Sequence, residues 1–329
     1  MAESCRQPLC RGNQRPPSSR SAWAGSVETE NSGEDVDGSP ALGRRVNRLL
    51  DAGIAISDQR PKASEIVYLA SCFIRFTLPH RRPPGNTSIR QDGSLTGSFS
   101  APSDVGLAYG RWPRLLLMYL TTQAVRMRSR DIYLDISMKR FMRKFGISAT
   151  GGVNGSIRQF KEQLLKTTST SLTVSSIADD GAFLLNRPVA DTYTLCWDAL
   201  CSEGCHRQPA IIRLGERAFS EMTKSAVPLD LRDIKALQQS PLALDIYCWL
   251  TFRVRSLIRP TFIPLNAFQN QFGAAYKTDA DFKRAFTTAL HEVSFVYPAV
   301  NVSLREYTLI LQRSPTSVPP ARSSSGRAV

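Results

Sequence analysis

Hydrophobic residues recur at intervals of three and four between Ser137 and Lys166, which predicts two short helices separated by a turn. The buried positions of the first helix are expected at Met138, Phe141, Met142 and Phe145. Those of the second are expected at Val153, Ile157, Phe160 and Leu164. Ser137 is a favourable N-cap, and Gly146 is expected to end the first helix before a glycine-rich turn. The pattern therefore predicts a helix-turn-helix.

The neighbouring segments extend this pattern on both sides. Pro113 opens a preceding helix whose buried positions are predicted to be Leu116, Tyr119, Leu120, Ala124 and Met127. Residues 132–135 form a short predicted strand. After Lys166 come the strand-like runs SLTVSSI and AFLLN around a turn at Asp179-Asp180-Gly181, and then the alternation Tyr193, Leu195, Trp197. Helix, strand, two helices and hairpin is the order of a winged helix-turn-helix.

The same order recurs between residues 240 and 313. Ser240 and Pro241 begin an apolar helix, and Phe268, Phe272 and Gly273 repeat the spacing of Phe141, Phe145 and Gly146. Asp279 is expected to cap the next helix, with buried positions at Phe282, Phe286, Ala289 and Val293. Closing strands are expected around Val302, Leu304, Tyr307, Leu309 and Leu311. The turns differ in length, so the repeat is one of order and not of residue-by-residue equivalence.

The fold class expected from these elements is α+β, with two tandem winged helix-turn-helix domains, small β elements and disordered termini. An extended strand is predicted up to Pro79, and a hairpin at Gln91-Asp92-Gly93 completes a small β platform. The connector holds two short helices around Phe219 and Ile234. The predicted division is a disordered tail 1–60, platform and first winged helix 65–205, connector 206–239, second winged helix 240–313 and disordered tail 314–329.

Charge favours a polyanionic partner. The chain has 329 residues, 42 Lys and Arg against 28 Asp and Glu, a formal net charge of +14 and a pI near 9.8. Residues 107–170 hold 12 basic and 3 acidic residues, or 12 − 3 = +9, so much of the excess lies around the predicted helix-turn-helix. This distribution indicates a basic domain and not only a basic tail.

The outer face of the second predicted helix supplies candidate DNA contacts. Asn154, Arg158 and Gln159 are the candidates for reading base edges, because Arg suits guanine, and Asn or Gln suits adenine. The candidates for phosphate contacts are Lys139, Arg140, Arg143, Lys144, Lys161, Lys166, Lys283 and Arg284. The alternative for each of these basic residues is a solvated surface position without a ligand.

Cysteine and histidine give little support for a metal or a cofactor. The chain has seven cysteines and no secretory signal, which predicts reduced thiols in a cytoplasm. It contains no run of eighteen apolar residues, so no membrane span is predicted. The competing site is Cys196, Cys201, Cys205 and His206, which are zinc-competent ligands close in sequence. Their spacing differs from the separated pairs of structural zinc sites, and Cys196 lies beside Trp197 in a strand pattern. No cofactor is expected.

Motifs of common enzyme classes are missing from the sequence. The run Gly151-Gly152-Val153-Asn154-Gly155 is not followed by the Gly-Lys-Ser/Thr of a nucleotide phosphate loop. His80, His206 and His291 are mutually remote, and neither HExxH nor GxSxG occurs. We therefore expect a protein that is not an enzyme, although motifs alone leave open a triad assembled from distant residues.

Several strings within residues 66–313 resemble the plasmid-encoded RepA replication initiator family. They are RFTLPHR, YGRWPRLLLMYLTTQAVR, FMRKFGI with the following GG, VPLDLRDIKALQQSPLALDIYCWLTFR and the FKRAF segment. The resemblance implies binding to repeated duplex DNA sites at a plasmid origin, control of plasmid copy number, and recruitment of host replication proteins such as a replicative helicase or initiator. Residues 1–60 and the C-terminal tail lie outside it, and the cysteine-bearing loop at 196–206 departs from it.

Two other functions remain open at this stage. A transcriptional repressor could use the same winged helices, and a scaffold could use them to bind proteins. The +9 segment counts against the scaffold. A homodimer is left open, no membrane partner is expected, and a bacterial, plasmid-associated cytoplasmic location is implied.

Overall fold

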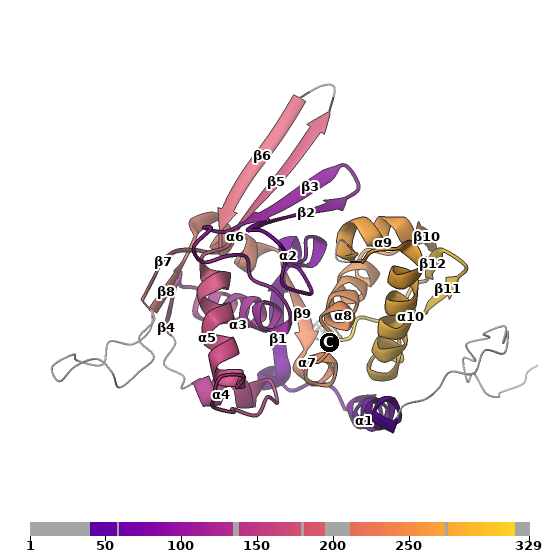
Figure 1. Ribbon diagram of the computed structural model, residues 1–329. Coiled ribbons are helices and arrows are strands. Elements are labelled where there is room, and N and C mark those ends of the chain that lie inside the picture. Colours follow the sequence, from indigo (N-terminus) through magenta and orange to yellow (C-terminus); the bar gives the residue numbers. More distant parts are fainter. Residues whose placement is uncertain are drawn as a thin grey trace, which may run out of the picture. The chain divides into compact units, whose positions relative to one another are not determined.

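The computed structural model describes residues 40–57, 59–133, 138–178, 181–194, 211–273 and 276–319. The described residues belong to one compact unit, shown in Figure 1. Helices and strands alternate along it, which confirms the predicted mixed α+β composition.

The helices fall mainly in the segments with three-and-four spacing. They are α1 (Pro40–Ser57), the short 3-10 helix η1 (Ala63–Glu65), α2 (Ser71–Arg75), α3 (Arg111–Met127), α4 (Met138–Lys144), α5 (Ser156–Thr168), α6 (Glu216–Lys224), α7 (Leu231–Leu237), α8 (Pro241–Val254), α9 (Leu265–Phe272) and α10 (Asp279–Val296). The Ser240 hydroxyl accepts a hydrogen bond from the Ala243 amide at 3.2 Å, which confirms the predicted start of α8. At α10 the capping side chain is Thr278 and not Asp279, which is the first residue of the helix.

The strands in the described part of the chain form four antiparallel sheets. They are β1 (Ile66–Ala70), β2 (Thr87–Asp92), β3 (Leu95–Ser100), β4 (Asp131–Tyr133), β5 (Ser171–Ala178), β6 (Gly181–Pro188), β7 (Ala190–Thr194), β8 (Ile211–Leu214), β9 (Ala226–Asp230), β10 (Thr261–Pro264), β11 (Val302–Arg305) and β12 (Thr308–Leu311). The sheet orders are β1-β9, β2-β3-β5-β6, β4-β8-β7 and β10-β12-β11.

Two of these sheets have the same topology. In each, the strand that follows the first helix pairs with the last strand of a hairpin: β4 with β8 and β10 with β12. The helices follow the same order, with α3, α4 and α5 in the first unit and α8, α9 and α10 in the second. The predicted internal repeat is therefore present in the arrangement of strands as well as in chain order.

The hairpin predicted after α5 forms, but its predicted place as the closing hairpin of the first unit was wrong. The runs SLTVSSI and AFLLN form β5 and β6, but β5 pairs with β3, so this hairpin extends the platform sheet seen at the top of Figure 1. The equivalent of β11 and β12 is β7 and β8. Because β8 lies within the predicted connector, part of residues 206–239 is integral to the first unit's sheet.

One apolar run folds differently from the prediction, and two single apolar residues differ from it in burial. The expected strand up to Pro79 is divided into β1 and the short helix α2, whose residues Cys72, Phe73 and Ile74 are all buried. A run that is buried on all sides has no polar face, so periodicity cannot distinguish strand from helix there. Met127 and Val153, both expected to be buried, are 68% and 75% exposed.

The segment predicted as an N-terminal tail contains α1. Leu49 is buried, and the Arg45 guanidinium pairs with the Glu292 carboxylate of α10, with Nε and Oε1 2.8 Å apart. A Cβ atom added to Gly53 would lie 1.9 Å from the Phe295 carbonyl oxygen, so glycine permits this close approach. The prediction of disorder was thus wrong for residues 40–57, while residues 1–39 lie outside the described part of the chain.

The C-terminal segment also packs in part. The Ser317 hydroxyl lies 2.8 Å from that of Tyr247, and Val318 is buried. The predicted tail 314–329 is therefore ordered up to residue 319, where the described residues end.

Candidate nucleic-acid interface

The turn between α4 and α5 is held by reciprocal hydrogen bonds. The Thr150 amide donates to the Ser156 hydroxyl at 2.9 Å, and the Ser156 amide donates to the Thr150 hydroxyl at 3.0 Å. The Ser156 hydroxyl donates in turn to the Ser148 carbonyl at 2.7 Å. Gly146, with φ of +70°, ends α4 as predicted. These contacts fix the start of α5, the helix with the candidate base-reading residues.

An aromatic cluster supports the two helices from within. The Phe141 ring lies 4.8 Å from that of Phe160 and 5.3 Å from that of Tyr119, measured between centroids. Trp112 of α3 contacts Phe160 edge-on at 5.6 Å. The predicted buried positions Phe141, Phe145, Phe160 and Leu164 are confirmed. Burial of this stripe leaves the opposite face of α5 towards solvent.

The three candidate base-reading residues are exposed on one side of the turn and α5. The Arg158 side chain makes no hydrogen bond or ion pair within the described residues. Gln159 differs, because its Oε1 accepts from the Trp112 indole at 3.4 Å and its Nε2 donates to the Asn154 carbonyl at 3.3 Å. The Arg158 side chain is thus available to a ligand in this conformation. Gln159 would exchange its two long hydrogen bonds for contacts with a base.

The candidate phosphate contacts of the first unit differ in exposure. Arg143 is exposed, and Lys161 is half-buried. The Lys144 ammonium lies 5.6 Å from the Tyr119 ring centroid, and partial burial, together with the nearby Arg126, lowers the Lys144 pKa. The side chains of Lys139 and Arg140 lie outside the described part of the structure.

Lys166 does not fit its predicted role. It is only 9% exposed, its ammonium lies 2.7 Å from the Glu162 carboxylate, and it stands 5.1 Å from the Tyr109 ring centroid. The sequence pattern placed it on the outer face, but one turn further along α5 that face is covered by the loop before α3. We therefore remove Lys166 from the candidate DNA contacts.

The second unit presents a basic groove on α10. It is lined by Ala280, Lys283, Arg284, Thr287, Thr288, His291 and Tyr307. The Lys283 ammonium stands 4.0 Å from the ring centroid of Tyr307, which lies in the β11–β12 turn. Arg284 forms an exposed ion pair with Asp281 at 2.9 Å, an interaction weak enough to exchange for a phosphate. Both predicted cations therefore lie where a ligand can reach them.

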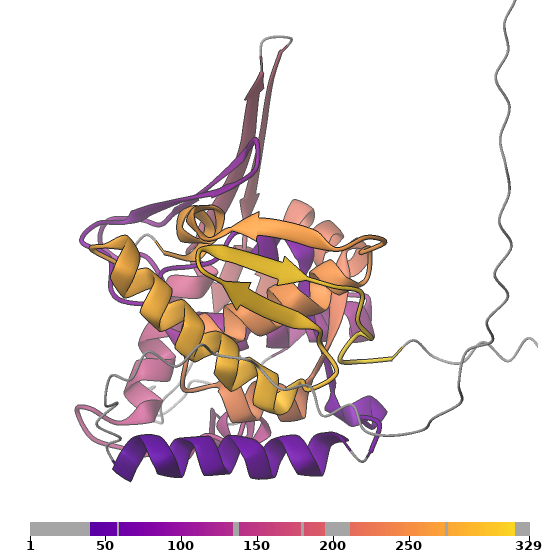
Figure 2. The same cartoon turned by 90° about the vertical axis from the view of Figure 1, so that its right-hand side faces the viewer.

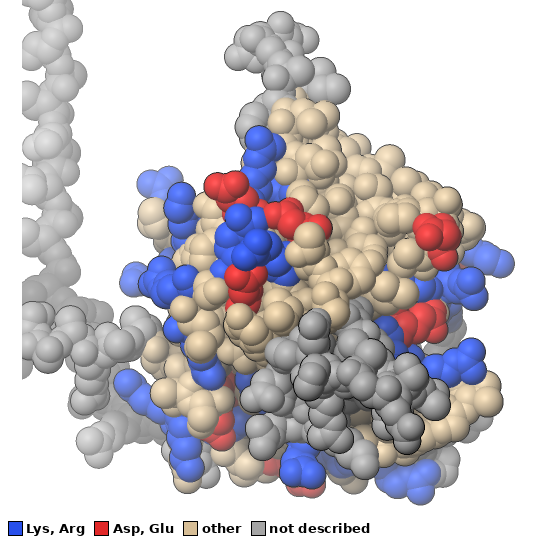
Figure 3. Space-filling model, turned by 90° about the vertical axis from the view of Figure 1, so that its left-hand side faces the viewer, with Lys and Arg blue, Asp and Glu red and all other residues tan. Residues whose placement is uncertain are grey.

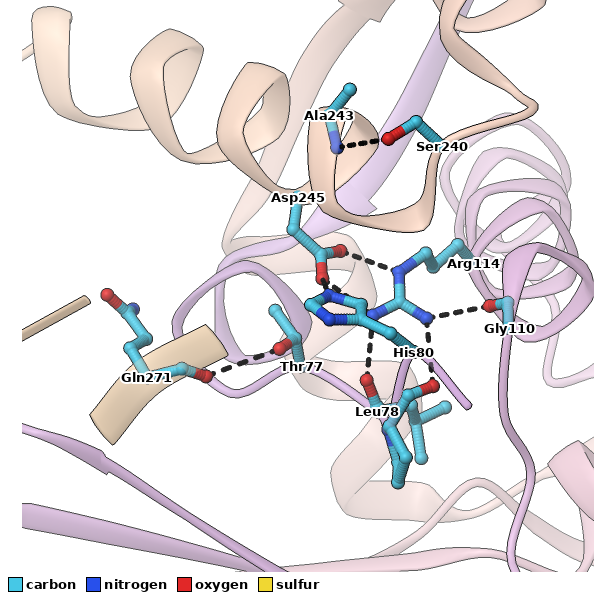
Figure 4. A network of polar contacts seen from close by, with 10 residues as sticks. Thr77, Leu78, His80, Gly110, Arg114, Ser240, Ala243, Asp245 and Gln271 are labelled. Carbon is cyan, nitrogen blue, oxygen red and sulfur yellow. Dashed lines mark hydrogen bonds and ion pairs between the residues drawn. The ribbon is translucent and has the colours of Figure 1, made fainter. Parts of the chain in front are cut away.

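A buried polar network connects the two units (Figure 4). The Arg114 guanidinium of α3 donates from Nε to Asp245 Oδ1 at 2.7 Å and from Nη2 to Asp245 Oδ2 at 2.6 Å. It also donates to the Leu78 carbonyl at 2.7 Å, and His80 Nε2 lies 2.8 Å from Asp245 Oδ2. Sequence reasoning did not single out this cluster, although a lone Asp within the apolar run LALDIYCWL was an available signal.

Burial governs ionisation in this network. Burial raises the pKa of Asp245, but Arg114 and His80 outweigh it and the net shift is downward. Burial lowers the His80 pKa, as do the nearby Arg114 and Arg90, against the opposing effect of Asp245. A neutral His80 that donates Nε2–H to Asp245 leaves Nδ1 without a hydrogen-bond partner among the described residues. The pair Arg114–Asp245 is therefore charged, and His80 acts as a neutral donor.

The surface seen from the left-hand side of Figure 1 carries both signs of charge. Figure 3 shows Lys and Arg spread over this face, with Asp and Glu among them. The strands β4 and β8, at the left of Figure 1, carry the ion pair between Asp131 and Arg213, with Nε and Oδ1 2.7 Å apart. The basic excess is thus not one uninterrupted patch on this face.

Other candidate sites receive no support from the described residues. Cys196, Cys201, Cys205 and His206 lie outside them, and within them no group of three or more His, Cys, Asp or Glu side chains could hold a metal ion. Cys72 and Cys248 are buried free thiols. None of the described helices has the length and apolar character needed to cross a membrane.

Comparison with known proteins gives one family match and two similar solved structures, both of domains 2 and 3 of RctB. Residues 107–260 match the family model described as plasmid encoded RepA protein. No curated protein matches the chain. Domains 2 and 3 of RctB, solved as a selenomethionine derivative, show 11% sequence identity and a TM-score of 0.49, with 74% of this chain and 96% of that chain covered. A second RctB structure of domains 2–3 shows 11% identity and a TM-score of 0.45, with 72% and 95% covered.

Proposed function

Residues 107–260 belong to the plasmid-encoded RepA family, and on that premise we propose that this chain is a plasmid replication initiator. It binds repeated duplex DNA sites at an origin and recruits host replication proteins there. The observation that carries the DNA-binding part is the presence of two units with the same topology, each of which has an exposed arginine on its third helix, Arg158 on α5 and Arg284 on α10.

Each unit is assigned as a winged helix-turn-helix. The paired orders β4-β8-β7 and β10-β12-β11 supply the strand and hairpin of this motif, and α4–α5 and α9–α10 supply its two helices. α5 and α10 are the proposed recognition helices. The β7–β8 and β11–β12 hairpins are the proposed wings, in place of β5–β6.

The proposed roles of the residues that contact DNA follow from their exposure and side-chain chemistry. Asn154, Arg158 and Gln159 would read base edges, with Arg158 best placed because it needs no rearrangement. Arg143, Lys144 and Lys161 would contact phosphates in the first unit, and Lys283 and Arg284 in the second. Under this proposal the chain acts in the bacterial cytoplasm by binding alone and cleaves no bond.

A mobility-shift titration against salt, followed by footprinting on the plasmid's own upstream region, tests the proposal. The expected result is protection of repeated sites, with a binding constant that falls steeply as salt rises. Salt-insensitive binding, or equal affinity for origin and random DNA, would contradict it. Protected repeats together with unaffected plasmid replication in an Arg158→Ala strain would instead indicate a transcriptional repressor.

A further inference from the structure

The sheet β10-β12-β11 has one face that no described helix covers. Figure 2 shows this face turned towards the viewer. Along β12, Leu309 and Leu311 are buried while Ile310 is half-buried, so the two faces of the strand are distinct. Phe262 of β10 and Ser303 of β11 are the cross-strand partners of Ile310 and therefore share its outer face.

Apolar side chains are exposed on this outer face and in the loop before it. Phe262, on the face, is 65% exposed, and Ile258, four residues earlier in the loop that leads into β10, is 89% exposed. Together with Ile310 they define what we call the Phe262 patch. Single exposed apolar residues need no explanation, but neighbouring ones on an uncovered sheet face are typical of a binding surface.

Positive charge surrounds the patch. Residues 255–264 and 301–313 contain four arginines and one acidic residue, Glu306. Arg255 and Arg259 flank Ile258 in the loop, and Arg305 lies on the outer face of β11; all three are exposed. None of the three forms an ion pair within the described part of the chain. Their charge is thus available to a ligand.

We propose that the Phe262 patch binds an acidic protein segment in which apolar side chains alternate with carboxylates. Apolar anchors would cover Phe262 and Ile258, and carboxylates would pair with the arginine rim. A second copy of the chain fits less well, because it would bring the same arginines and a like net charge of +14. Duplex DNA fits less well, because its charged phosphates would lose water against Phe262.

The inference goes beyond DNA binding and does not depend on it. The patch lies on the outer face of the sheet, whereas the proposed DNA groove lies on α10 beside the β11–β12 turn. A protein partner could therefore be bound while Lys283 and Arg284 contact DNA.

The test uses the full chain and a fluorescein-labelled peptide of about 15 residues, with Leu and Phe alternating with Asp and Glu. Phe262→Ser should weaken peptide binding about tenfold, because a buried aromatic anchor dominates such interfaces. Leu184→Ser is the matched control: Leu184 is 70% exposed but lies on β6 in a different sheet, so affinity should not change. A peptide with amides in place of the carboxylates should bind at least tenfold more weakly.

A charge-reversal pair separates a local contact from the overall field of the protein. Arg259→Glu should reduce peptide affinity about tenfold, whereas Arg60→Glu, at another exposed site and with the same change in net charge, should reduce it about twofold at most. Equal effects of the two reversals, or unchanged affinity in Phe262→Ser, would overturn the proposal. So would Phe262-dependent binding to anionic lipid vesicles or random duplex DNA without peptide binding.

Discussion

Arg114 and Asp245 form a buried bidentate ion pair, with Nε–Oδ1 and Nη2–Oδ2 distances of 2.7 and 2.6 Å. The arginine belongs to α3 and the aspartate to α8, the first helices of the two repeated units. Because Arg114 also donates to the carbonyl of Leu78, the same side chain anchors the segment that follows α2. The two units are thereby joined through charge as well as through apolar packing.

Asp245→Ala should destabilise the protein by about 3–5 kcal/mol, because Arg114 would remain buried without its counter-ion. Urea unfolding at neutral pH measures the change in free energy. The double variant Arg114→Met/Asp245→Leu is the control, and it should be more stable than Asp245→Ala alone. A loss below about 1 kcal/mol in Asp245→Ala would show that the pair is not buried in solution.

Stability should fall as the pH drops below about 6.5, the ordinary value of the His80 pKa. Burial lowers the His80 pKa in the folded state, so below that pH the unfolded chain takes up a proton that the folded chain does not. The contribution of His80 to the free energy of unfolding is therefore fully present above about pH 6.5. It decreases on acidification by at most about 1.4 kcal/mol per pH unit. Asp245, whose folded pKa is lowered, adds to the loss only near and below pH 3.8.

The His80→Gln variant isolates that contribution, because an amide retains a donor for Asp245 but does not titrate. Urea unfolding between about pH 7.5 and 5 should show a shallower decline for this variant than for the unaltered chain. Identical slopes would mean that His80 titrates alike in the folded and unfolded states.

Arg158→Ala should reduce specificity for the origin repeats by about 1–3 kcal/mol, because a base-edge contact is lost. Lys144→Ala should weaken binding to origin and random DNA alike and reduce the salt slope by about one unit, because its proposed contact is with phosphate. Mobility-shift titrations at several salt concentrations measure both. If both variants affect origin and random DNA equally, the proposed roles are wrong.

Lys166→Met is the control for these titrations. Its ammonium is paired with Glu162 and hidden from solvent, so the salt slope should remain as in the unaltered chain. A reduced slope would return Lys166 to the set of phosphate contacts.

Gly155→Ala should disturb the turn before α5. The added Cβ would lie 2.3 Å from the Gly151 carbonyl oxygen and 2.4 Å from that of Thr150, so the backbone must move. We expect a loss of about 1–3 kcal/mol in unfolding free energy, with weaker DNA binding. Gly151→Ala is the matched control, because nothing lies within 4 Å of its added Cβ.

Sequence patterns identified the elements that bury one face and expose another. The spacing of Phe141, Phe145, Phe160 and Leu164 correctly placed α4 and α5, and the comparable spacing of Phe268 and Phe272 placed α9. The exposure of Asn154 and Arg158 followed from the same pattern. Burial of one helix face and exposure of the other depend on residues close in sequence, so the spacing of apolar residues predicts them directly.

What the pattern missed depends on partners distant in sequence. SLTVSSI and AFLLN were correctly read as a hairpin, but only the pairing of β3 with β5 shows which sheet it joins. The burial of Lys166 depends on Tyr109, which lies far from it in the chain. Likewise, α1 is positioned by the ion pair between Arg45 and Glu292 and by the contact of Gly53 with α10, and both partners lie far from α1 in the sequence.

The first unit matches the element order of the second with only α3, β4, α4, α5, β7 and β8. The strands β5 and β6 have no counterpart among the described residues of the second unit. The projecting hairpin is consequently an insertion between α5 and β7, attached to the platform through β3. Its length can therefore change while the other elements of the first unit keep their own pairings.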